Sequence, residues 1–327
     1  MERRQYNALD IGKIIAAILV VAIHTNPLEN VDSVVVKRVF EVINTLAVPF
    51  FFMCSSYFFF KDEDEQKYKA RLFRFVKLYI IWSALYMPLT IYSYLNDNSS
   101  WTSRIWSLFR GFFLLGENYY SWQLWYLLAL IYGLILFCVM IRKRISVNVM
   151  GIIVIALYLL SCTMEYLVAN RSELSGMLLF GARVVGATFV NGRLFTAPLY
   201  IFVGYMLNKK DCLISKQILL PVLLVAGAVR VFVTNAYLDG CLRAIMAISV
   251  FVILLTMNLA NNAWYKRIRQ LSTVIYFAHM YIYFFLINII DSHKGFLVFL
   301  WTLISGISLG VVILVLKGKN KFLQKIF

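Results

Sequence analysis

The sequence lacks the cysteine patterns of a disulfide framework or a zinc site. Its cysteines are odd in number, include no CxxC pair and are scattered along the chain, at Cys54, Cys138, Cys162, Cys212 and Cys241. It also lacks an internal repeat, a low-complexity segment and a continuous basic patch. The formal net charge is +16, but the basic residues fall in short clusters between hydrophobic runs. We therefore expect no disulfide-bonded fold, no metal site and no nucleic-acid partner.

Hydrophobic side chains dominate what is present. The 327 residues are 61% hydrophobic and 16% aromatic, with a mean hydropathy of +0.77, which is more apolar surface than a soluble core needs. The sequence predicts an all-α, polytopic membrane bundle, a single membrane-embedded domain over residues 1–327. Its apolar runs approach the roughly 20 residues that cross a bilayer. We expect ten spans: 11–27, 36–60, 73–95, 122–141, 148–168, 194–207, 216–236, 242–259, 270–290 and 295–316.

Two shorter apolar pieces, 105–116 and 176–190, are expected to be interfacial or re-entrant helices. Most of the 32 lysine and arginine side chains fall in alternate connections between the expected spans, and these connections include both ends of the chain. By the positive-inside rule, both termini are predicted to face the cytoplasm, which agrees with an even number of spans. The first span ends in His24-Thr25-Asn26-Pro27 without a small-residue cleavage site, so we expect it to be retained rather than removed as a signal peptide.

The first span carries a lysine and a histidine on one stripe of a helix. Lys13 and His24 are eleven residues apart, within roughly 20° of three full turns, and lie roughly 16 Å apart along the axis. Between them on that stripe are Ala16, Ala17 and Val20, small enough to leave a groove beside the helix. Such a lysine is often only a topology anchor, and such a histidine only an interfacial polar residue. Spacing alone does not decide between these interpretations.

Charged side chains also gather at the predicted cytoplasmic ends of the first and third spans. Asp10 lies one turn before Lys13, where it could orient the lysine or cap the helix. Arg71, Arg74 and Lys77 lie close together on a helix that opens the third span. One guanidinium group can donate hydrogen bonds to two oxygens of a phosphate, so this cluster suits a phosphate ligand. The alternatives are topological anchoring and binding of anionic lipid.

Two further spans carry polar residues in unusual places. The run 48–57 has a proline followed by hydroxyl residues, which is typical of a kinked helix packed closely against a neighbour, although Ser56 and Tyr57 could bind a ligand. His279 lies near the middle of the ninth span, flanked at i−3 and i+4 by Tyr276 and Tyr283. A histidine at that depth needs a partner, so it either joins helices or lines a polar cavity.

The two longest outer loops are candidates for the mouth of an external acceptor site. They cover residues 96–121 and 169–193. The polar and aromatic side chains in or next to them are Glu117, Trp122, Glu173, Arg183 and Arg193.

Taken together, these pieces resemble the family-3 membrane acyltransferases, bacterial proteins of ten spans that carry acyl groups across or onto cell-envelope acceptors. The family signature is a basic residue, ten residues and then histidine, which here runs from Lys13 to His24 after Leu9-Asp10. Further similar segments are the run 48–57, the pair Arg71-x-x-Arg74, the segment 197–205 and the segment Tyr276 to His279. Two departures are the serine in Ser55-Ser56-Tyr57 where glycine is usual, and the absence of a histidine before Leu124-Trp125.

The resemblance implies that acyl-CoA, acetyl-CoA above all, is the donor, without a metal. Lys13, Arg71 and Arg74, with Lys77 nearby, would hold its phosphates on the cytoplasmic side. His24, with Asp10 in support, would be the general base on a hydroxyl of a small-molecule or glycan acceptor in the envelope or outside the cell. The acceptor side would be lined by Ser56, Tyr57, Trp125, Tyr276 and His279. The location implied is the bacterial plasma membrane, with the lipid bilayer as a partner.

A second interpretation is left open. The segments 23–25 and 49–57 also resemble the membrane half of vancomycin-resistance serine racemases, a branch linked to serine uptake. In that reading the chain is an L-serine transporter domain, and His24 or His279 meets the carboxylate of the amino acid. A racemase half would follow the last span in the cytoplasm, so we expect it to be absent here or to have been removed. A third interpretation is a membrane anchor for a partner enzyme.

Overall fold

The structure is a computed structural model that describes residues 5–62, 64–190, 192–209, 215–290 and 293–317. Throughout these ranges the regular elements are helices, which agrees with the predicted all-α class. Cys212 lies outside these ranges, as do six of the lysine and arginine residues that enter the topology prediction: Arg3, Arg4, Lys210, Lys319, Lys321 and Lys325. The four other cysteines are all free thiols.

Each predicted span coincides with one helix or with two consecutive ones. The helices are α1 (Asn7–Thr25), α2 (Val34–Asn44), α3 (Ala47–Phe59), α4 (Glu65–Leu95), α5 (Trp101–Arg110), α6 (Trp125–Arg142), α7 (Val147–Ala169), α8 (Gly176–Thr188), α9 (Ala197–Lys209), α10 (Lys216–Phe232), α11 (Ala236–Thr256), α12 (Trp264–Ile287) and α13 (Phe296–Lys317). Short turns η1 (Gly111–Leu115), η2 (Trp122–Leu124) and η3 (Arg193–Thr196) lie between them.

Within the described ranges, eight helical segments are long and apolar enough to cross a membrane, with α2 and α3 together forming one of them. A ninth arises if α8 and the segment Arg193–Lys209, which meet at 83°, count as one broken span. The 17 residues of α10 and the 13 residues of α9 are short for a full crossing. The total of ten spans and the cytoplasmic termini therefore stay predictions.

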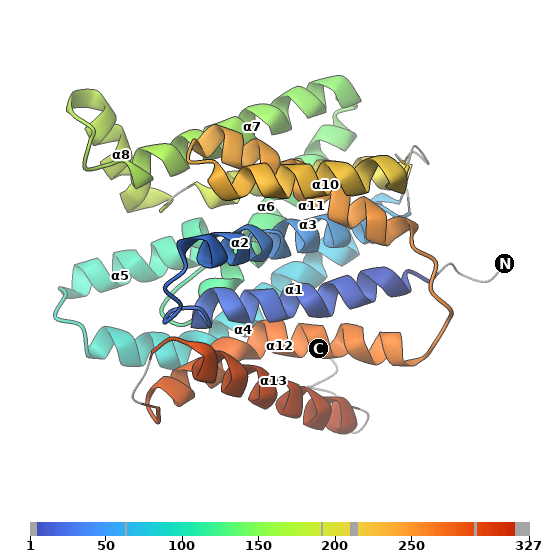
Figure 1. The fold of residues 1–327 in the computed structure, drawn as a ribbon. Helices are drawn as coiled ribbons and strands as arrows, with labels where there is room; N and C mark the ends of the chain where they lie inside the picture. Colours follow the sequence, from blue (N-terminus) through green and yellow to red (C-terminus); the bar gives the residue numbers. More distant parts are fainter. Residues whose placement is uncertain (1–4, 63, 191, 210–214, 291–292, 318–327) are drawn as a thin grey trace. The chain divides into compact units, whose positions relative to one another are not determined.

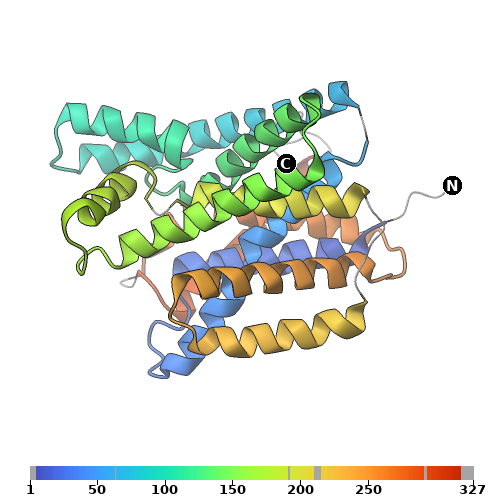
Figure 2. The ribbon, with the colours of Figure 1, turned by 90° about the horizontal axis from the view of Figure 1, so that it is seen from above.

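The chain forms two compact units. The first comprises Met1–Phe51, Leu213–Phe232 and Leu242–Phe327, and the second comprises Phe52–Cys212 and Val233–Cys241. In the first unit, α12 packs against both α1 and α13, while α2 contacts α1 and α10 (Figure 1). In the second unit, α6 contacts α4 and α9, and α7 contacts α8, α9 and η3 (Figure 2).

One face of α12 is used for packing against α13. Val274 and Ala278 form a buried apolar cluster with Ile313. Gly310 on α13 lies so close to Leu271 that a Cβ at this position would overlap the leucine side chain. This packing fixes the rotation of α12 and thereby the direction in which its polar residues point.

Candidate functional site

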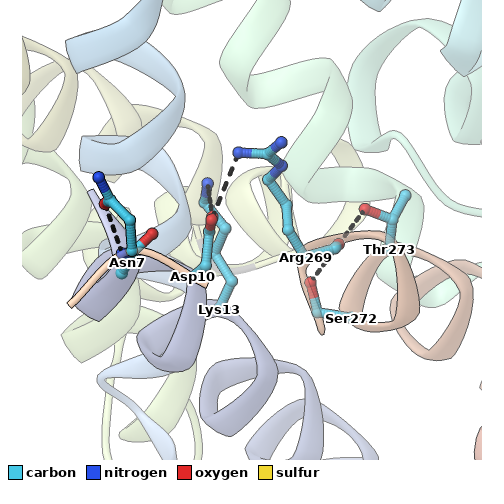
Figure 3. Close-up of polar contacts among 7 residues, drawn as sticks. Asn7, Asp10, Lys13, Arg269, Ser272 and Thr273 are labelled. Atoms are coloured by element: carbon cyan, nitrogen blue, oxygen red, sulfur yellow. Dashed lines mark hydrogen bonds and ion pairs between the residues drawn. The ribbon is translucent and has the colours of Figure 1, made fainter. Parts of the chain in front are cut away.

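A shared carboxylate joins the N-terminal turns of α1 and α12 in the first unit. Asp10 is only 6% exposed, and its two oxygens accept hydrogen bonds from Lys13 Nζ at 3.2 Å and from an Arg269 nitrogen at 3.3 Å (Figure 3). Charge-assisted bonds of this kind are stronger than neutral ones. Asp10 therefore contacts Lys13, as the predicted role of orienting the lysine requires, and that role stays a prediction. The alternative role as a helix cap is wrong, because α1 begins at Asn7 and Asp10 lies inside its first turn.

The same end of the unit is held by side chains that bond to backbone groups. Asn7 Nδ2 donates to the carbonyl oxygens of Leu259 at 3.3 Å and Ala260 at 3.1 Å, which ties α1 to the segment after α11. Ser272 and Thr273 both donate to the carbonyl of Arg269 (Figure 3). Arg269 was missed as a site residue because its cluster with Lys266 and Arg267 reads as positive-inside anchoring.

At the other end of α1, His24 meets His279 of α12. The centroids of the two imidazole rings are 5.3 Å apart, and the ring planes are inclined by 36°. His24 lies half-buried in the last turn of α1, whereas His279 is fully buried. Sequence spacing put His24 and Lys13 on one helix, and the tertiary fold adds a partner from α12 at each end of it.

The ring of His279 has one engaged nitrogen and one bare nitrogen. Its Nδ1 lies 2.7 Å from the carbonyl oxygen of Tyr276 and 3.1 Å from that of Ile275. A carbonyl oxygen only accepts, so Nδ1 carries the hydrogen and donates it, which leaves a lone pair on Nε2. Among the residues that the structure describes, Nε2 has no hydrogen-bond partner. A buried hydrogen-bond acceptor without a donor lowers the stability of the folded state, so Nε2 is a candidate contact for a ligand.

The two tyrosines that flank His279 differ in their contacts. Tyr276 is buried beside it, with ring centroids 6.4 Å apart, and meets the Phe51 ring edge to face at 5.3 Å. Tyr283 donates its hydroxyl hydrogen to the carbonyl of His293 at 2.8 Å. Tyr283 therefore holds the segment after α12, and Tyr276 is the tyrosine that lies at the histidine pair.

The groove expected along α1 is closed in this structure. Ala16, Ala17 and Val20 are only 3%, 0% and 3% exposed. Nearer the start of α1, a Cβ on Gly12 would overlap the side chains of Phe50 and Leu254. The prediction of an open groove is therefore wrong for these positions, because small residues in a membrane helix allow neighbours to approach closely instead of leaving a void.

The basic cluster of α4 lies in the second unit. Arg71 bonds to the Asp62 carboxylate and to the carbonyl of Phe59, while Arg74 and Lys77 are exposed on the same helix. The hydrogen bond from Arg71 lowers the pKa of the Asp62 carboxyl below its ordinary value. Any anion that binds at Arg71 has to compete with this carboxylate.

The predicted acceptor residues of the second unit are mainly packed. Ser56 is fully buried and donates to the carbonyl of Met53 at 3.2 Å within α3. Tyr57 is 8% exposed, and its carbonyl accepts a hydrogen bond from Asn208 Nδ2 at 3.1 Å. The ring of Trp125 meets the Phe52 ring edge to face, with 6.1 Å between centroids.

Two residues of the long predicted outer loops meet at Trp125. Arg193 forms an ion pair with Glu117, and its guanidinium carbon lies 4.9 Å from the centroid of the Trp125 ring. Burial raises the pKa of the Glu117 carboxyl, and the charge of Arg193 opposes that shift. The two loops were singled out separately, and the ion pair between them is visible only in the fold.

The chain matches a protein family model over most of its length, and it matches part of the length of several larger proteins. The profile of the acyltransferase domain, family 3, matches residues 6–316. An amino-acid racemase from Enterococcus faecalis is 26% identical over 298 residues, covering 85% of this chain and 41% of that protein. A serine/alanine racemase from Enterococcus gallinarum is 32% identical over 139 residues, covering 39% of this chain and 18% of that protein. The chain spans less than half the length of these relatives, and no solved structure matches it.

Proposed function

The chain belongs to acyltransferase family 3, and from this premise we propose that it moves an acyl group, acetyl above all, from cytoplasmic acyl-CoA to a hydroxyl of an envelope or extracellular acceptor. The observation that carries the proposal is the meeting of His24 and His279 at one end of α1, with Lys13 and Arg269 at the other end. Imidazole titrates near neutral pH, so His24 suits the role of general base toward a hydroxyl.

In this proposal the donor phosphates bind the cations at the start of α1 and α12. Lys13 and Arg269 share the single carboxylate of Asp10, which leaves one net positive charge there and holds both side chains in place. Arg269, 49% exposed, is open to a ligand. Arg71, Arg74 and Lys77 of the second unit remain a further candidate set for phosphate. On the acceptor side, we assign Tyr276 and His279 in the first unit, while Ser56, Tyr57 and Trp125 stay predictions.

Binding of CoA by the purified protein tests the donor assignment. We expect CoA to raise the unfolding temperature in detergent, because a ligand at 100 times its Kd stabilises the folded state by about 2.7 kcal/mol. Pantetheine, which lacks the nucleotide phosphates, is the matched control and should have a much weaker effect. Transfer of labelled acetyl from acetyl-CoA in proteoliposomes made with bacterial envelope extract tests the reaction. The proposal is overturned if neither CoA binding nor transfer above protein-free vesicles is found.

The contact between Asp62 and Arg71 gives a prediction for the second phosphate candidate. We expect Asp62→Asn to tighten CoA binding about two- to fivefold, because the anion no longer competes with an exposed carboxylate for the guanidinium. Asp64→Asn removes the same charge two residues away and keeps a side chain that can accept from Gln66 N at the start of α4. Equal affinities in the two variants would contradict a phosphate site at Arg71 and leave only a general charge effect.

L-serine transport is the second candidate, favoured by the names of the relatives, which are racemases of amino acids. In that case the imidazoles of His24 and His279 would meet the amino acid rather than an acyl acceptor. Uptake of labelled L-serine into proteoliposomes distinguishes the two functions. Uptake above that of protein-free vesicles, without any effect of CoA on the unfolding temperature, would favour transport. CoA binding without uptake would favour transfer.

A further inference from the structure

Nε2 of His279 is a buried nitrogen for which the structure shows no hydrogen-bond donor among the described residues, so we ask what role it has. The side chain is fully buried, and its Nδ1 is occupied by the carbonyls of Tyr276 and Ile275. Its Nε2 has a lone pair and, within the described ranges, no donor. The imidazole of His24, whose centroid lies 5.3 Å from that of His279, is a neighbouring ring that can donate a hydrogen bond. A histidine that served only to join turns of α12 would have no use for a free acceptor beside a second imidazole.

We propose that His279 is a positioning residue for His24 in the acyl transfer proposed above, on which this inference rests: its Nε2 accepts a hydrogen bond from one ring nitrogen of His24. The distance between the rings agrees with this bond. An N–H···N bond of about 2.9 Å between two imidazoles puts their centroids roughly 5 Å apart. The observed separation is 5.3 Å, and in this proposal the half-buried His24 ring turns so that one of its nitrogens faces Nε2.

The bond has a definite consequence for the chemistry. With one nitrogen of His24 donating to His279, the hydrogen is kept on that nitrogen and the other nitrogen is left as the base. The acceptor hydroxyl gives its proton to this base while its oxygen forms a bond to the acyl carbonyl carbon. The carbon–sulfur bond then breaks, and the imidazolium of His24 returns the proton to the departing CoA thiolate. While His24 is charged, the hydrogen bond to His279 stabilises it, as the aspartate does in a catalytic triad.

Two substitutions at position 279 separate this role from a structural one. The amide of an asparagine reaches the position of Nδ1, so His279→Asn keeps a donor for the carbonyl of Tyr276 and loses the acceptor at Nε2. The amide of a glutamine reaches the position of Nε2, so His279→Gln keeps the acceptor and loses the bond to the carbonyl. The two variants are similar in polarity, and each keeps the hydrogen-bonding function of one ring nitrogen while removing that of the other.

The test measures kcat, the Kd for CoA and the unfolding temperature of both variants in the full-length protein in proteoliposomes or detergent. We expect His279→Asn to lower kcat about 10- to 100-fold while the Kd for CoA stays within twofold. We expect His279→Gln to keep more of kcat than His279→Asn, although it unfolds at a lower temperature.

The opposite order of activity overturns the inference: full activity in His279→Asn with a loss in His279→Gln means that the Nδ1 bond alone matters. A wild-type protein that transfers no acyl group overturns the proposed function, and the assignment of His279 falls with it. Active wild-type protein with equal kcat in both variants removes the assignment and leaves the acyltransferase proposal standing.

Discussion

Replacing His24 by alanine is expected to lower kcat for acyl transfer by about 10² to 10⁴-fold, the range over which a positioned general base contributes to catalysis. The variant removes the half-buried imidazole at the end of α1 and leaves Lys13, Asp10 and Arg269 in place. Binding of CoA should therefore change little, and the loss should appear in kcat. Single-turnover transfer from labelled acetyl-CoA in proteoliposomes measures it.

His293→Ala is the matched control for that experiment. His293 lies after α12, and its backbone carbonyl, which the substitution preserves, is the group that accepts the hydrogen bond from Tyr283. We expect this variant to retain wild-type transfer. If His24→Ala also retained full transfer, the assignment of His24 as the base would have to be abandoned, whatever the effect of substitutions at His279.

Replacing Gly204 by alanine is expected to lower the stability of the second unit, because the added methyl group would overlap α3. A Cβ on Gly204 would overlap Ser56 Oγ and lie 2.7 Å from the carbonyl oxygen of Met53 and 3.0 Å from the amide nitrogen of Tyr57. Two of these three atoms belong to the backbone of α3, so α9 has to move away as a whole. Such overpacking costs about 1–3 kcal/mol. The unfolding temperature in detergent measures the effect.

Gly186→Ala is the control for backbone effects. Gly186 lies in α8, and a Cβ there would meet no atom within 4 Å. Alanine is the better helix former by about 1 kcal/mol, so this variant should unfold at the wild-type temperature or above it. An equal loss in both variants would show that the contact between α9 and α3 does not explain the effect at Gly204. Since Ser56 and Tyr57 are predicted acceptor residues, activity measured in parallel also tests their part in the site.

Some contacts of the candidate site follow from the spacing of residues along the chain, and others do not. Asp10 and Lys13 are three residues apart, and their contact follows from the geometry of one helix. Arg269 reaches the same carboxylate from 259 residues away, where a basic cluster reads as a topology signal. The groove expected beside Ala16, Ala17 and Val20 failed for a related reason: small side chains predict close approach, and the sequence does not tell which neighbour fills the space.

By itself, the sequence determined the class of the protein and the place of its helices. A run of about 20 apolar residues can satisfy its backbone hydrogen bonds in lipid only as a helix or in a closed barrel, so hydropathy alone locates the apolar helices. Only the tertiary structure decided which polar groups meet. The pairing of His24 with His279, and of Glu117 with Arg193, depends on the rotation and packing of helices around their axes. That rotation is set by contacts such as the one between Gly310 and Leu271, which lie on different helices. The periodicity of hydrophobic residues within one helix does not show which helices pack together.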